Sequence, residues 1–287
     1  MFQDMMLKLW KRQFARHRFL MQFHDPQIFF KSQWQKDDRP SLLYILYRWL
    51  LTAFLFGTWL LSVIDPKHLD KSIHFRAKWM IYLTNWGYSL CFLQSLLCAL
   101  TLTIWYCQFK RFGGSVWTSA TYRMYWVMNI IATDVAFGIT VLYWALLYDE
   151  TKMEVDAQNI FVHGTNSLVM LIDLFVVAHP LYLVQCYWSV LFGIVYIVFS
   201  IIYHLCGGTS RNEEPFIYPV LDWGKPGKTT IVCVLVLVFL IVLHIFSCCI
   251  QLFRSHIDKK LRKKSYTAEV TKPPINGFDN VASNDIV

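Results

Sequence analysis

Residues 228–252 read KTTIVCVLVLVFLIVLHIFSCCIQL, an apolar run whose only ionisable side chains are Lys228 and His244. A run of this length spans the roughly 30 Å hydrocarbon core of a bilayer as an α-helix, whereas a surface helix of a soluble protein shows a polar face. The whole chain agrees, because 56% of its 287 residues are hydrophobic and 16% are charged, against roughly 25% charged in soluble domains. The composition predicts a polytopic membrane protein and excludes a soluble globular, disordered or coiled-coil chain.

Five further apolar stretches precede this one. Backbone groups in lipid must be paired within their own segment, and no stretch alternates like a barrel strand, so each is expected to be a helix. The predicted fold class is all-α, a polytopic membrane bundle of six transmembrane helices, flanked by the segments 1–40 and 253–287. The predicted spans cover residues 41–64, 80–106, 122–148, 160–178, 181–205 and 228–252.

The boundary between the fourth and fifth spans depends on a proline. The apolar stretch 160–205 is interrupted only by His179-Pro180, and one helix of that length would extend for about 70 Å, more than twice the hydrocarbon core. Proline ends or kinks a helix and disfavours helical backbone in the residue before it. A tight turn is therefore predicted at Pro180.

Lysine and arginine counts in the connecting segments predict the orientation. One side of the six-span arrangement carries 17 of them and the other carries 7, and the richer side normally faces the cytoplasm. Both termini are therefore predicted to be cytoplasmic. The formal net charge of +8 is then mainly a topology signal, with attraction to anionic inner-leaflet lipids, and does not indicate nucleic-acid binding.

The two terminal segments differ from the spans in composition. The N-terminal segment 1–40 is basic, and its first part has apolar residues at near-helical spacing, which suits either a helix on the membrane surface or a solvated basic tail. The C-terminal segment 253–287 begins with a basic cluster, continues as a polar stretch with Pro273-Pro274, and is expected to be disordered. The apolar residues of the first part are Phe2, Met6, Trp10 and Phe14.

We predict no cofactor or metal.

The cysteines leave two interpretations open. Four of the eight fall at predicted cytoplasmic helix ends. Thiols there are candidates for S-palmitoylation, while packing as small apolar side chains is the alternative. The four are Cys107, Cys186, Cys248 and Cys249.

Three charged residues lie deep inside the predicted spans: Arg48, Asp134 and Asp173. Ionisable groups at that depth are costly and are therefore candidates for function. One arginine and two aspartates predict an ion pair within the bundle together with a second carboxyl group that is protonated or hydrogen-bonded. A proton relay is the alternative, with no further support from the spacing.

A hydroxyl and an imidazole share one depth in the predicted bundle. Thr84 is the fifth residue of the second span and His163 the fourth of the fourth span, so both lie about one helical turn below the non-cytoplasmic surface. Such a pair is the minimum for a base-activated nucleophile, with the threonine attacking and the histidine as base. The alternative is a core histidine and a threonine bonded to its own helix. Supporting polar side chains at the same level are Asn85, Asn166 and His204.

Three motifs together resemble the rolling stone family of animal multi-pass membrane proteins: LTNWG at 83–87, HGTN at 163–166 and YPVLDW at 218–223. The resemblance covers about residues 42–256 and implies a role in myoblast fusion during muscle development. More distantly, the chain is similar to the androgen-induced intramembrane threonine hydrolases, which cleave fatty acid esters of hydroxy fatty acids. That similarity implies Thr84 as nucleophile and His163 as base, although the residues following each differ from the pattern of those enzymes.

Two functions follow as expectations. The first, which the family resemblance implies, is a non-enzymatic protein of the plasma membrane that belongs to the fusion machinery. It would act through lateral or cytoplasmic protein partners or through lipid, because its predicted outer loops are short. The alternative is an intramembrane Thr/His hydrolase of lipid esters, with an acyl lipid as its ligand. A channel or transporter ranks third, because the deep charges lack the spacing of a permeation pathway.

Overall fold

The structure is a computed structural model that describes residues 13–112, 119–147, 160 and 164–270. Within these residues it is helical, and its extended pairing is limited to an isolated antiparallel bridge between Ser32 and Val177. The predicted all-α class is therefore confirmed for the described chain.

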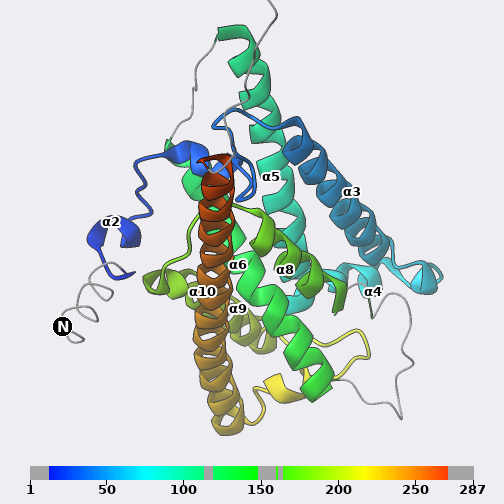
Figure 1. The fold of residues 1–287 in the computed structure, drawn as a ribbon. Helices are drawn as coiled ribbons and strands as arrows, with labels where there is room; N and C mark the ends of the chain where they lie inside the picture. The colour runs from blue at the N-terminus through cyan, green and yellow to red at the C-terminus, as the bar shows by residue number, and fades with distance from the viewer. Residues whose placement is uncertain (1–12, 113–118, 148–159, 161–163, 271–287) are drawn as a thin grey trace, which may run out of the picture.

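Five helices are long and apolar enough to cross a membrane (Figure 1). The central one is α6, since 67% of its most apolar window is buried, against 22% for α3 and for α9. Helix α6 packs against α5, α8, α9 and α10, while α3 packs on α5. The five are α3 (Leu42–Ile64), α5 (Leu83–Phe112), α6 (Ser119–Leu142), α9 (Cys186–Leu205) and α10 (Pro226–Val270).

Six full-length spans are not confirmed. The predicted fourth span, 160–178, contains the helix α8 (Asn166–Val176), which has only 11 residues, and residues 161–163 lie outside the described chain. Helix α8 ends at Val176 and extended backbone follows at Val177. The break before α9 is thus longer than the tight turn predicted at Pro180, since a 3-10 turn (Leu183–Gln185) comes between them.

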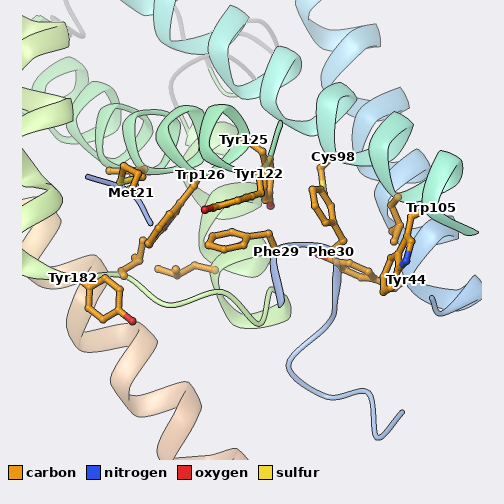
Figure 2. Packing of buried hydrophobic residues seen from close by; sticks show 14 of the residues in the cluster. Met21, Phe29, Phe30, Tyr44, Cys98, Trp105, Tyr122, Tyr125, Trp126 and Tyr182 are labelled. Carbon is orange, nitrogen blue, oxygen red and sulfur yellow. The ribbon is translucent and has the colours of Figure 1, made fainter. Parts of the chain in front are cut away.

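Residues 13–40, which we call the strap, pack on one end of the bundle. Phe29 and Phe30 of the strap are fully buried in an aromatic cluster with residues of α3, α5 and α6. Figure 2 shows the Phe29 ring beside Tyr122 and Trp126, with centroid distances of 5.1 and 4.8 Å. Residues 13–40 are therefore part of the fold instead of a solvated tail, while residues 1–12 lie outside the described chain.

Helix α10 continues well past the predicted span, through the basic cluster to Val270. Its extension holds the strap: Asp258 accepts a hydrogen bond from the Gln33 side chain (2.8 Å), and Arg262 donates to the backbone carbonyls of Gln33 and Gln35. The expected disorder beyond residue 253 is therefore wrong as far as residue 270. Residues 271–287 lie outside the described chain.

The opposite end of the bundle, which we call the loop end, is closed by residues 65–82 and 206–225. Lys78 is buried there and donates to Thr209, to the Ser210 carbonyl and to Glu213. The hydrogen bond from Lys78 holds the pKa of the Glu213 carboxyl below its usual value. The loop end contains α4 (Ile73–Ala77) and the 3-10 turns Pro66–His68, Lys78–Ile81 and Pro219–Leu221. The other short elements are α2 (Arg16–Phe19), the 3-10 turn Pro26–Phe30 and a π-helical turn Tyr143–Leu147.

Candidate intramembrane site

Arg48 of α3 and Asp173 of α8 form an ion pair inside the bundle. The Arg48 Nη1 atom lies 2.9 Å from the Asp173 Oδ1 atom, and both side chains are buried. Arg48 also donates to the hydroxyls of Tyr44 and Tyr125, while Tyr47 donates to Asp173. Removing two charges from water is costly unless they are paired and their remaining hydrogen-bonding positions are used. The tyrosine hydroxyls use several of those positions, so this pair serves to fix α8 against α3.

Asp134 of α6 has a different partner, His244 of α10. The His244 Nδ1 atom lies 2.8 Å from Asp134 Oδ2, and its Nε2 atom lies 3.0 Å from the Tyr182 carbonyl. Ser189 and Ser247 donate to the same carboxyl group. The two imidazole nitrogens therefore connect Asp134 of α6 with the Tyr182 carbonyl. The second carboxyl is therefore also paired, which joins α6, α9 and α10.

An apolar cavity of about 120 Å³ lies between α5, α6, α9 and α10 toward the loop end. Its wall includes Gly138 and Gly193, and the missing side chain of Gly193 lets Leu237 of α10 pack closely against α9. Segment 218–221 lines it from the loop end. Neither ion pair contributes a residue to this wall. The deep charges therefore do not form a relay with this cavity.

Thr84 and Tyr218 both line this cavity. Burial raises the pKa of Tyr218 to about 12, so the phenol stays neutral at physiological pH. Thr84 comes from the motif at 83–87 and Tyr218 from the motif at 218–223. Two of the three motifs quoted from the sequence therefore meet at the cavity.

The other candidate residues do not gather around Thr84 in the described chain. The Asn85 side chain donates to the Trp79 carbonyl (2.7 Å), and His204 lies 3.3 Å from the Pro215 carbonyl. Asn166 accepts a hydrogen bond from Thr140 of α6. Helix α8 thus packs on a face of α6 other than the one that lines the cavity. The proposed base, His163, lies outside the described residues, so its position relative to Thr84 stays a prediction.

The cysteine side chains differ in exposure. Cys107 and Cys249 are exposed and Cys186 is half-buried, whereas Cys248 is buried. A buried thiol is not available for acylation, which restricts the palmitoylation hypothesis to the first three. Among the residues that the structure describes, no group of three or more His, Cys, Asp or Glu side chains is arranged to hold a metal ion.

Sequence reasoning missed the buried cation Arg254. It donates to the carbonyls of Leu174 and His179, and so binds the end of α8, where backbone carbonyls lack helical partners. Its position falls in the segment 253–287, for which disorder was expected. The absence of glycine and proline between Gly227 and Pro273 was the available signal that α10 continues past it.

Two comparisons with known proteins point to the same family. The model of the family described as Protein rolling stone matches residues 1–273. The Drosophila melanogaster protein named Protein rolling stone is 32% identical to this chain over 234 residues, which is 78% of this chain and 82% of the fly protein. No solved structure matches. With this family match over nearly its whole length and its apolar helical bundle, the chain belongs to the rolling stone family of membrane proteins.

Proposed function

We propose that this protein acts in the fusion of myoblasts during muscle development, as its sequence motifs and its family membership imply. The observation that carries the proposal is the family match over residues 1–273. The loop-end segment 206–225 folds back on Lys78 and on Asp65, to which Arg211 donates at 2.7 Å. A loop end held in this way offers little surface for adhesion to another cell, so the protein acts through lateral partners or through lipid.

A cell-fusion assay tests this role. The chain is depleted from muscle precursor cells that express it, and the nuclei in each fibre are counted. Depletion is expected to lower the count, and re-expression of the wild-type chain is expected to restore it. Normal fusion in fully depleted cells would contradict the proposal. Restoration by chains carrying Thr84→Ala would show that the role needs no Thr84 chemistry.

We also propose that the chain crosses the plasma membrane six times, with α8 and residues 177–182 as the fourth crossing. The strap and the α10 extension contact each other through Gln33 and Asp258, which supports an even number of crossings. Asn166 lies beside Thr140, and Val177 pairs with Ser32 of the strap. Epitope tags at both termini of intact cells are expected to be inaccessible to antibody until the membrane is permeabilised. One accessible terminus would contradict six crossings.

A second candidate function is intramembrane hydrolysis of lipid esters. It is supported by the position of the Thr84 hydroxyl on the wall of an apolar cavity that suits part of an acyl chain. In this reaction Thr84 attacks the ester carbonyl carbon while His163 takes the hydroxyl proton. The acyl group forms an ester with Thr84 as the alcohol leaves with a proton, and water then hydrolyses that ester.

Labelling of the purified chain with a fluorophosphonate probe tests this chemistry. Labelling of the wild-type chain that is lost in Thr84→Ala and in His163→Ala is expected from the proposal. Thr140→Ala is the matched control, because Thr140 lies on α6 beside Asn166 and Ser167 and does not line the cavity. Absence of labelling in folded wild-type protein would contradict the hydrolase.

A further inference from the structure

A second pocket, of about 370 Å³, lies at the strap end, far from Thr84 in the fold. Strap residues form one wall and the beginning of α6 forms the other. Its volume falls in the range of roughly 300 to 1,000 Å³ that is usual for small-molecule sites. The lining residues are His17, Gln22, Phe23, His24, Pro26, Tyr122 and Arg123.

The lining of this pocket favours an anion. Three of the lining side chains are basic, and none carries a carboxylate. The nearest acidic residue in the sequence, Asp25, accepts a hydrogen bond from the Gln27 backbone (3.1 Å) at the start of a 3-10 turn. Tyr122 and Arg123 also belong to the beginning of the long helix α6, where the helix dipole favours negative charge.

One polar group of this pocket, Tyr122, is held in place by the core, and it contacts the Arg123 side chain. The Tyr122 ring stacks on the buried Phe29 ring at 5.1 Å, and its hydroxyl accepts hydrogen bonds from the Phe23 backbone (3.3 Å) and from Arg123 Nε (3.4 Å). The hydroxyl hydrogen is then left to be donated to a ligand. A guanidinium and a hydroxyl in fixed positions match the oxygens of a phosphate group, which Arg binds through two parallel N–H donors.

The surroundings of the pocket suit a membrane surface. Tyr122 and Arg123 are near the first residue of a candidate span, Ala120–Ala145, so they lie close to the headgroup level. On the strap beside the pocket, Phe19 is 50% exposed and Leu20 is 44% exposed. Exposed apolar residues next to basic ones are typical of a segment that lies in the membrane interface.

We propose that this pocket binds the phosphate-bearing headgroup of an anionic lipid, with Arg123, Tyr122, His17 and His24 as its donors. The same phosphate chemistry occurs in soluble inositol phosphates, and the test separates the two sources. The site is independent of the Thr84 cavity, and occupation of it would fix the strap and the start of α6 at the membrane surface.

The experiment measures thermal unfolding of the purified full chain in detergent with four probes: short-chain phosphatidylinositol bisphosphate, short-chain phosphatidylcholine, soluble inositol trisphosphate and inorganic phosphate. A ligand that binds only the folded chain raises the unfolding temperature. The bisphosphate lipid is expected to raise it, and phosphatidylcholine is not. Arg123→Gln is expected to weaken the apparent affinity about tenfold, because a charge-assisted contact is lost.

Arg39→Gln is the matched control, since it removes the same charge from an exposed position of the strap that does not line the pocket. It is expected to leave the affinity unchanged. If Arg123→Gln alters folding without ligand, His24→Gln at an exposed pocket position replaces it, with a smaller expected loss of affinity. Inositol trisphosphate that binds as tightly as the lipid would assign the site to the soluble source. The proposal would be overturned if the bisphosphate lipid, inositol trisphosphate and inorganic phosphate all left the unfolding temperature unchanged. Equal weakening of the affinity by Arg39→Gln would also overturn it.

Discussion

The strap end and the loop end of the bundle are built in different ways. At the strap end, the Arg48–Asp173 pair lies near an aromatic cluster in which Phe29 and Phe30 have no exposed surface. At the loop end, an apolar cavity remains between α5, α6, α9 and α10. The filled core at the strap end holds the helices together, and the strap-end pocket lies outside this core, between the strap and the beginning of α6. The cavity at the loop end instead lies between the long helices themselves. The difference places structural order in the strap-end core and the candidate Thr84 chemistry toward the loop end.

The largest effect is expected from Asp173→Ala. It leaves Arg48 buried without a carboxylate, which should cost about 3–5 kcal/mol of unfolding free energy. Chemical denaturation in detergent measures this. Asp222→Ala is the control at the loop end, because its partner Lys225 is 70% exposed, and its effect should be much smaller. Equal losses would remove the distinction between the two ends. Arg48→Met combined with Asp173→Leu should recover much of the loss.

The second largest effect is expected from Phe29→Ala, which should lower the unfolding free energy by about 3 kcal/mol because it leaves a cavity in the aromatic cluster. Phe19→Ala removes the same ring from a half-exposed strap position and should have a much smaller effect. Denaturation together with limited proteolysis of the strap distinguishes them, since a detached strap is cleaved faster. A strap that stays resistant in Phe29→Ala would mean that the contacts with α10 suffice to hold it.

Two glycine substitutions sharpen the description of the loop end. A Cβ atom at Gly87 would come within 2.6 Å of Ile139 and 2.7 Å of Val135, so Gly87→Ala should destabilise the bundle by about 1–3 kcal/mol. At Gly138, on the cavity wall, the nearest atom would be Leu243 Cδ1 at 3.4 Å. Gly138→Ala should therefore be neutral, or stabilising by up to about 1 kcal/mol through helix propensity. Thermal unfolding of both variants tests this, and a reversed order would contradict the placement of the cavity.

The smallest expected effect is the pH dependence of the stability that Glu213 contributes at the loop end. The pKa of Glu213 is lowered by its hydrogen bond from Lys78, so its contribution to stability is present above the pKa of an unfolded glutamate. That contribution is lost as the pH falls through the lower pKa of the folded state. Wild type should therefore be slightly more stable than Glu213→Gln at neutral pH, and the difference should vanish in acid. A difference that grows in acid would contradict the pairing. Thermal unfolding between neutral pH and about pH 3 measures it.

The sequence predicted those parts of the fold that depend on long apolar runs. Five of the expected spans correspond to long helices, and the break around Pro180 is present, because lipid leaves few alternatives to a helix. The short α8 could not be predicted. Its length depends on tertiary contacts, namely the bridge from Val177 to the strap and the hydrogen bonds from Arg254.

For the candidate site, the sequence predicted only how deep its residues lie in the membrane. The presence of an ion pair followed from one arginine and two aspartates, but which aspartate is its partner depends on helix rotation, which a single sequence does not fix. Thr84 was found from its depth and motif, whereas its position beside the same cavity as Tyr218 brings together residues that are distant in the sequence. The strap was missed because Phe29 and Phe30 sit in a polar, basic context that has no helical period.

Helix α10 has a mechanical consequence. Its 45 residues form an unbroken rod of about 68 Å, more than twice the hydrocarbon thickness of a bilayer. Anything attached beyond Val270 is therefore presented at a set height and a set angle from the membrane. Inserting one residue into the rod beyond Arg262 would lift the attachment by about 1.5 Å and turn it by about 100°. A partner of the C-terminal segment could thus sense a change in helix phase as well as in distance.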